Sequence, residues 1–271
     1  MSAGRENDGR RIARLFRQYR SLADDERICD LDRILEDDGI EVAEASMRDP
    51  GYTACLLRPV PDAPGGILLA PGQSRGRRRF SLAHELGHYH IPRHSQLLPG
   101  WCGDEDMTAS SGGEDGIEWE ANQFAAELLM PRHLFRRDSL DHDPGFASII
   151  RLAGPDGYDV SITAAAIRYV DVAPHRCALV CAERGVIKWV SKSDDFFYRI
   201  PWIGDRVPAE SVAADVFRGE EGSMEPAGLE PYVWLEVEQR RPVELFESTL
   251  SIPSQAQVLS LLWVVPEGSL V

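Results

Sequence analysis

The sequence has few cysteines and no long hydrophobic run. Its five cysteines include no C-x-x-C pair, so we expect no disulfide framework and a reducing compartment. No uninterrupted apolar stretch approaches the roughly 20 residues that a membrane-spanning helix needs. The segment 1–20 is crowded with charged residues and lacks the apolar core of a signal peptide. These absences predict a cytoplasmic protein with no membrane partner.

The composition is that of a folded, acidic protein. Of the 271 residues, 43% are hydrophobic and 27% are charged, which excludes the low-apolar signature of a disordered chain. The 44 acidic residues exceed the 29 basic ones and give a net charge of −15. A surface of this sign repels phosphate backbones. Direct DNA binding is therefore not expected.

The hydrophobic pattern changes along the chain from mostly helical to mostly extended. Apolar spacing predicts helices near residues 12–19, 28–35, 77–90, 115–130, 146–152, 162–170 and 209–217. Period-two or continuous apolar runs predict strands at 40–45, 52–57, 66–69, 177–182, 186–190, 232–237, 243–246 and 258–265. The segment 95–116 is rich in Ser, Gly and acidic residues and is expected to be a loop.

This order of elements predicts an α+β fold with three parts. We expect a first domain of helices and a small sheet over 1–140 and a helical connector over 141–174. The connector resembles a helix-turn-helix, because Gly154-Pro155-Asp156-Gly157 separates its two helices. A mixed carboxy-terminal domain is expected over 175–271.

One motif carries most of the chemistry. His84-Glu85-Leu86-Gly87-His88 is an H-E-x-x-H sequence inside an expected helix. Histidines at i and i+4 project from one helical face, so both imidazoles can bind one metal ion. Two unpaired buried imidazoles would be costly, whereas metal ligation satisfies both rings.

A hydrolytic zinc site needs a third protein ligand, and two candidates compete for that role. His94 follows His88 by six residues, as in the metzincin pattern, but Ile91 stands where that pattern requires glycine. Glu118 lies on the next helix, about 55° from the centre of its apolar face, while Glu120 lies about 105° away. We therefore expect Glu118 to face inward as the third ligand and Glu120 to face water.

The same helix offers a residue that can support the metal ligands. Asn122 stands one turn beyond Glu118. From there its side chain is placed to hydrogen-bond a ligand imidazole and hold its tautomer.

The segments around these residues resemble the ImmA/IrrE family of zinc metallopeptidases over about residues 10–140. The resemblance rests on two stretches, Arg79-Phe80-Ser81-Leu82-Ala83 directly before the H-E-x-x-H motif, and Glu118-x-x-Ala121-Asn122-x-Phe124-Ala125-Ala126-Glu127-Leu128-Leu129-Met130-Pro131. It implies a zincin-like domain in which His84, His88 and Glu118 bind zinc and Glu85 is the catalytic carboxylate. It also implies a helix-turn-helix-like segment and a GAF-like domain after the peptidase.

For the function, the resemblance implies an endopeptidase that cleaves a co-encoded helix-turn-helix repressor of the XRE type and so relieves repression of stress-response or mobile-element genes. Two alternatives stay open. In the first, the protein is a metal-binding regulator that captures or destabilises the repressor without cleaving it. In the second, it is a sensor whose peptidase site is vestigial. Zinc suits two imidazoles and a carboxylate best, and manganese or another divalent ion is also admitted.

One cysteine adds a further hypothesis. Cys102 lies in the segment between the two helices that carry the expected ligands. Its thiolate could occupy the fourth zinc position and keep the enzyme latent. A buried, inert cysteine is the more common alternative.

Overall fold

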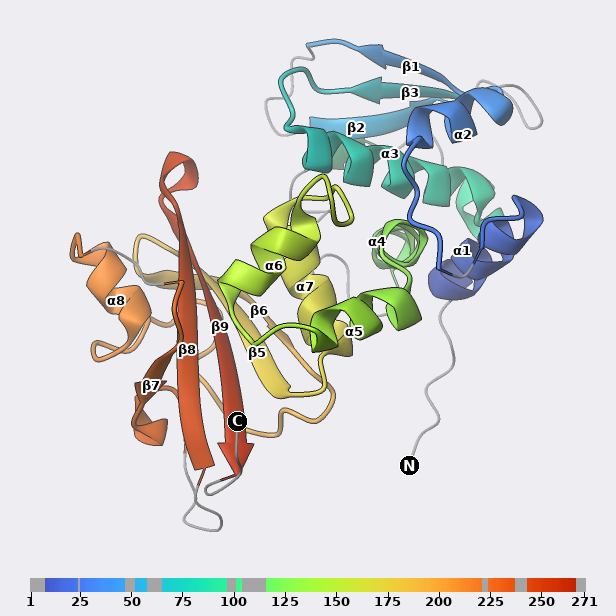
Figure 1. Ribbon diagram of the computed structural model, residues 1–271. Helices are drawn as coiled ribbons and strands as arrows, with labels where there is room; N and C mark the ends of the chain where they lie inside the picture. Colours follow the sequence, from blue (N-terminus) through green and yellow to red (C-terminus); the bar gives the residue numbers. More distant parts are fainter. Residues whose placement is uncertain are drawn as a thin grey trace. The chain divides into compact units, whose positions relative to one another are not determined.

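The computed structural model describes residues 8–23, 25–46, 52–57, 65–96, 101–103, 116–220, 224–236 and 243–266. Within these ranges the fold is α+β, with helices α1 to α8 and two sheets (Figure 1), which confirms the predicted class. The chain divides into two compact units, residues 1–134 with 153–164 and residues 135–152 with 165–271. The domain boundaries near 140 and 174 stay predictions.

The first unit contains a small mixed sheet. Its strands are β1 (Glu41–Glu44), β2 (Tyr52–Leu57), β3 (Gly66–Leu69) and β4 (Trp101–Gly103), in the order β1-β3-β2-β4. Strand β1 runs parallel to β3, whereas β2 is antiparallel to both β3 and β4. The first three strands were predicted. The prediction of loop for 95–116 is wrong at β4, where three residues pair with the edge of β2.

Two helices of this unit carry the expected site. They are α3 (Arg75–His90) and α4 (Ile117–Leu129), and α3 lies between the sheet and α4 (Figure 1). Leu82 and Leu86 of α3 are fully buried. Helix α3 ends before Pro92, and Ile91 has the extended backbone that a residue preceding proline prefers.

Two further helices complete the unit, α1 (Asp8–Tyr19) and α2 (Leu31–Asp37). The buried Arg17 of α1 donates to the carbonyl of Leu128 on α4 at 3.1 Å, and the rings of Phe16 and Phe124 lie 6.0 Å apart. Helix α4 is therefore covered by α1 as well as by α3. This double cover buries more of α4 than one apolar stripe would.

The segment after α4 contains α5 (Arg132–Leu140), α6 (Phe146–Ala153) and α7 (Ile162–Val172). The helices predicted at 146–152 and 162–170 are thus confirmed as helices. None of the helices in the described part of the chain combines the length and the apolar character that crossing a membrane requires.

The second unit contains a five-stranded antiparallel sheet. Its strands are β5 (Arg176–Glu183), β6 (Val186–Lys192), β7 (Ala227–Leu229), β8 (Val243–Ile252) and β9 (Gln257–Pro266), in the order β6-β5-β9-β8-β7. The predicted hairpin of β5 and β6 is confirmed. Arg184 and Gly185 at its turn both have positive φ, which matches the twist of the flanking strands.

A short helix, α8 (Val212–Phe217), is joined to this sheet through one buried carboxylate. Glu247 on β8 accepts from the backbone N–H groups of Val212 and Ala213 and from the indole N–H of Trp234, at 2.9, 3.2 and 2.9 Å. The strand predicted at 232–237 is wrong, because Pro231–Val233 form a 3-10 turn. That turn leads Trp234 into the core, where its indole N–H finds its acceptor.

Candidate metal centre

Helix α3 places two imidazoles side by side. His84 and His88 are one turn apart and are 0% and 2% exposed. Their Nε2 atoms lie 3.1 Å from each other. Two ring nitrogens of neighbouring helical turns therefore point at the same small volume, as the i, i+4 spacing predicts.

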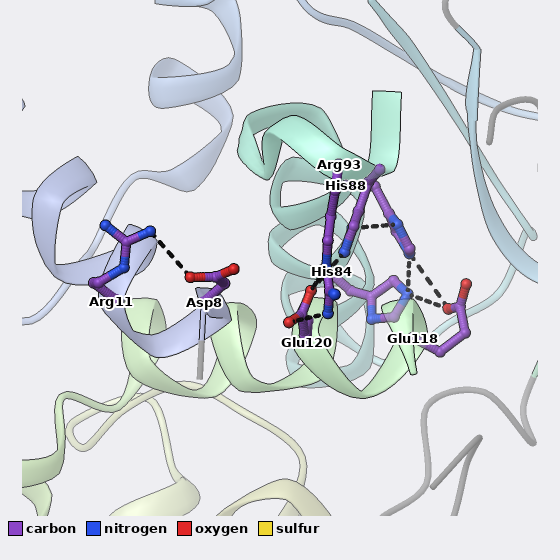
Figure 2. Close-up of polar contacts among 8 residues, drawn as sticks. Asp8, Arg11, His84, His88, Arg93, Glu118 and Glu120 are labelled. Carbon is purple, nitrogen blue, oxygen red and sulfur yellow. Dashed lines mark hydrogen bonds and ion pairs between the residues drawn. The ribbon is translucent and has the colours of Figure 1, made fainter. Parts of the chain in front are cut away.

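Helix α4 brings a carboxylate to the same place. The Oε2 atom of Glu118 lies 3.1 Å from Nε2 of His84 and 3.3 Å from Nε2 of His88 (Figure 2). Glu118 is the more accessible of the three, with 24% of its side chain exposed. The residue predicted as the third ligand and the two histidines are thus brought together as one group that could hold a metal ion.

The spacing of these atoms fits a small tetrahedral cation. Ligand atoms roughly 2.0–2.1 Å from a tetrahedral zinc ion lie about 3.3 Å from one another. The three observed separations are 3.1, 3.1 and 3.3 Å. Imidazole lone pairs and a carboxylate oxygen facing one another at this distance repel unless a cation or a proton lies between them. The donor set and its geometry therefore both fit a divalent metal.

The electrostatics of Glu118 favour the ionised form that a ligand requires. Burial by itself raises the pKa of Glu118, but its contacts with the imidazoles of His84 and His88 outweigh burial and hold the pKa below its ordinary value. The carboxylate is therefore charged at neutral pH.

One amide contacts the first histidine. Oδ1 of Asn122 lies 2.9 Å from Nδ1 of His84. When this oxygen accepts the Nδ1 proton, the Nε2 atom keeps its lone pair for the site. Asn122, predicted as the supporting residue, is in position for that role.

The carboxylate of the H-E-x-x-H motif is buried on α3. Glu85 is 1% exposed. It lies within electrostatic reach of Cys55 on β2, because burial and then the charge of Glu85 raise the pKa of the Cys55 thiol to about 11. Glu85 thus belongs to the interior between α3 and the sheet.

A second group of residues stands behind His88, and sequence reasoning missed it. Nδ1 of the buried His94 lies 3.0 Å from Nδ1 of His88, and Nε2 of His94 lies 3.0 Å from Oε2 of Glu120. Arg93 donates to the same Glu120 oxygen at 2.7 Å (Figure 2). Burial lowers the pKa of His94 despite the nearby Glu120 carboxylate, which favours a neutral ring.

The expectation that Glu120 faces water is wrong. Glu120 is 5% exposed, because α1 covers that side of α4 and the carboxylate is paired with His94 and Arg93. His94, considered above as a possible third ligand, instead contacts His88 and Glu120 through its two ring nitrogens. The side chain of Cys102, proposed above as a latency ligand, lies outside the described residues.

Comparisons with known proteins place this site in a family. Residues 36–153 match the Peptidase_M78 family model, described as an IrrE N-terminal-like domain. No curated protein matches the chain. A solved structure titled Mycobacterium tuberculosis transcriptional regulator matches with a TM-score of 0.57 at 15% identity, covering 96% of this chain and 76% of that one. At this identity the likeness concerns the fold alone. The family model covers both α3 and α4, and over residues 36–153 the chain is therefore an IrrE N-terminal-like domain of the ImmA/IrrE family, as the sequence resemblance predicted.

Proposed function

We propose that the protein is a zinc-dependent endopeptidase that cleaves a helix-turn-helix repressor of the XRE type, relieving repression of stress-response or mobile-element genes. The observation that carries the proposal is the convergence of His84, His88 and Glu118 within a peptidase-family domain. A structural role for these residues would not require three ligand atoms at metal-binding distances from one another.

The proposed roles follow from the placement of each side chain. His84, His88 and Glu118 would hold zinc, or manganese in its place. The bound ion would polarise the scissile carbonyl and make water more acidic. Asn122 would keep the ring of His84 in the tautomer that presents Nε2.

Glu85 would move the proton. Its carboxylate follows the ligand His84 directly in the sequence and is 1% exposed. We propose that it accepts a proton from the attacking water and passes it to the leaving amine.

The substrate class is inferred from charge and from the structural neighbour. A chain with a net charge of −15 is repelled by DNA, so it would reach a DNA-bound repressor through the repressor's own protein surface. The neighbour titled a transcriptional regulator supports a place in gene regulation. These two features favour a regulatory protein as the substrate.

We also propose that the helices of 141–174 form a helix-turn-helix-like connector that packs or docks on protein instead of reading DNA. Arg168 on α7 is 2% exposed, and its guanidinium lies 2.8 Å from Asp171, so it is not free to contact phosphate. The antiparallel sheet over 175–271 supports a GAF-like or docking domain after the connector.

The proposal is tested with the full chain and a co-encoded helix-turn-helix protein as substrate. Wild type and Glu85→Gln are incubated with the repressor and zinc or manganese, the products are separated on a gel, and repressor binding to its operator is measured in parallel. We expect fragments and loss of DNA binding with wild type, and intact repressor with Glu85→Gln. Equal loss of DNA binding with both proteins and no fragments would replace cleavage by capture.

A further inference from the structure

The two histidine ligands have different partners behind them. His84 is held by the neutral amide of Asn122. His88 is held by a chain of three side chains, His94, Glu120 and Arg93, that ends in an ion pair. The first two of these are almost completely buried, with 0% of His94 and 5% of Glu120 exposed.

Only one arrangement of protons satisfies this chain when His88 binds a metal through Nε2. The proton of His88 is then on Nδ1, so Nδ1 of His94 must accept it across the 3.0 Å contact. His94 consequently carries its own proton on Nε2 and donates it to Oε2 of Glu120, also at 3.0 Å. Every hydrogen bond then has one donor and one acceptor, and both rings are neutral, as ligation requires.

Arg93 makes Glu120 the final hydrogen-bond acceptor in this series of side chains. Its guanidinium pairs with both carboxylate oxygens of Glu120. A guanidinium has only donors, so both carboxylate oxygens act as acceptors toward it. The carboxylate in turn orients His94, and His94 orients His88.

We propose that His94 and Glu120 are positioning residues for the ligand His88, which they hold in the Nδ1-protonated tautomer and make a stronger metal ligand than a ring facing only an amide. This inference rests on the proposed function in one respect, namely that His84, His88 and Glu118 bind a metal. A merely structural His94 would fill the space beside His88 without affecting the affinity of the site for metal.

The test compares the zinc affinity of the full chain with that of variants, by competition with a chromophoric chelator. His94→Met keeps the volume and removes the acceptor, whereas His94→Gln keeps an acceptor. His90→Met is the matched control, because His90 lies on α3 with the two histidine ligands but its Nε2 contacts Asp38 at 3.0 Å instead of the site. The melting temperature of each metal-free protein is measured alongside.

Loss of a hydrogen-bonded partner behind a ligand lowers metal affinity by about 10–100-fold. We expect a loss of this size for His94→Met, a clearly smaller loss for His94→Gln and unchanged affinity for His90→Met. If His94→Met bound zinc with wild-type affinity, this inference would be wrong but the proposed function would still stand. Absence of zinc binding by the wild type would overturn the proposed function together with the inference.

A second measurement needs no variant. Long-range nitrogen–proton NMR spectra of the zinc-loaded wild type report which ring nitrogen of each histidine is protonated. We expect His88 to be protonated on Nδ1 and His94 on Nε2. A His94 protonated on Nδ1 cannot accept from His88, and its detection would overturn the inference even if His94→Met failed to fold.

Discussion

Gly87 lies in direct contact with Phe124. A Cβ atom on Gly87 would be 3.1 Å from both Cβ and Cδ1 of Phe124, closer than the usual separation of about 3.5–4.0 Å between carbon atoms. Gly87 is next to His88 on α3, and Phe124 is on α4, which also carries Glu118. The absence of a side chain at Gly87 therefore sets the helix spacing across which the ligand atoms meet.

Gly87→Ala should destabilise the protein and weaken metal binding. Phe124 is fully buried and packs on Phe16, so it has little room to move away. Overpacking of this kind costs about 1–3 kcal/mol, which outweighs the gain of roughly 1 kcal/mol when alanine replaces glycine in a helix. The measurements are urea unfolding of the metal-free chain and zinc affinity.

Gly228→Ala is the control for Gly87→Ala. Among the residues that the structure describes, a Cβ atom there would meet only Phe246, at an ordinary distance of 3.8 Å, and we expect little change in zinc affinity. Greater stability and unchanged zinc affinity in Gly87→Ala would mean that α3 and α4 move apart easily, so that Gly87 would not set their spacing.

Much of the site follows from helical periodicity. His84 and His88 share a face because four residues make about one turn, and Glu118 was expected to turn inward because it lies near the apolar stripe of its helix. The structure brings these three together. Asn122 follows from the same periodicity, one turn after Glu118.

The hydrophobic periodicity of one helix does not show whether another helix covers the face opposite its apolar stripe. Glu120 lies away from the apolar stripe, yet it is buried because α1 packs on α4. His94 follows α3 after a proline. Its Nε2 atom contacts the carboxylate of Glu120 only because α4 packs beside it in the folded chain. The sequence signals for this pair are a histidine shortly after a helix-ending proline and an acid off the apolar stripe, and each of them is common in sites that bind nothing.

Removing one ligand should remove the metal. His84→Ala deletes an imidazole, and Glu118→Gln keeps the size of the side chain but loses its charge. We expect His84→Ala to purify without zinc and Glu118→Gln to lose more than about 100-fold in affinity, beyond the effect of an indirect partner. Metal analysis of the purified proteins and chelator competition measure both effects.

The matched control for the ligand variants is Glu41→Gln. Glu41→Gln makes the same chemical change as Glu118→Gln, but at an exposed position of β1, and we expect it to contain as much zinc as the wild type. Full zinc occupancy in His84→Ala would show that the ion binds elsewhere, and the ligand assignment would then be wrong.

Glu247 should make the stability of the chain fall as pH rises. Burial raises the pKa of Glu247, although four hydrogen bonds oppose that effect. The folded chain therefore holds this proton to higher pH than the unfolded chain does. Stability is lost as pH rises above the ordinary carboxyl pKa, and the loss is complete once pH passes the folded value.

Glu247→Gln isolates this contribution. Glutamine stays neutral but presents fewer acceptors to Val212, Ala213 and Trp234, so we expect it to be less stable by about 1–3 kcal/mol at acidic pH. The difference in the free energy of unfolding between Glu247→Gln and wild type should narrow as pH rises. Urea unfolding followed by tryptophan fluorescence measures this difference at each pH. Glu244→Gln, at an exposed position on the same strand, is the control. A difference that widens with pH would mean that the folded state prefers the ionised carboxylate.

The thiols should differ sharply in their reactivity. Burial raises the pKa of Cys177 and of Cys181 to about 12, whereas Cys29 is exposed. At pH 8 a thiol with a pKa near 12 is about one part in ten thousand thiolate, against roughly a quarter for an ordinary thiol. Iodoacetamide should therefore label Cys29 in the native protein and reach Cys177 and Cys181 only after unfolding.

Peptide mapping by mass spectrometry identifies each labelled thiol, and Cys29→Ser is the control that removes the fast site. Labelling of Cys177 or Cys181 at the rate of Cys29 would show that β5 opens in the native state. Slow labelling of both would show that their reactivity is limited by burial in the sheet, so that neither thiol can respond to an oxidant while the second unit stays folded.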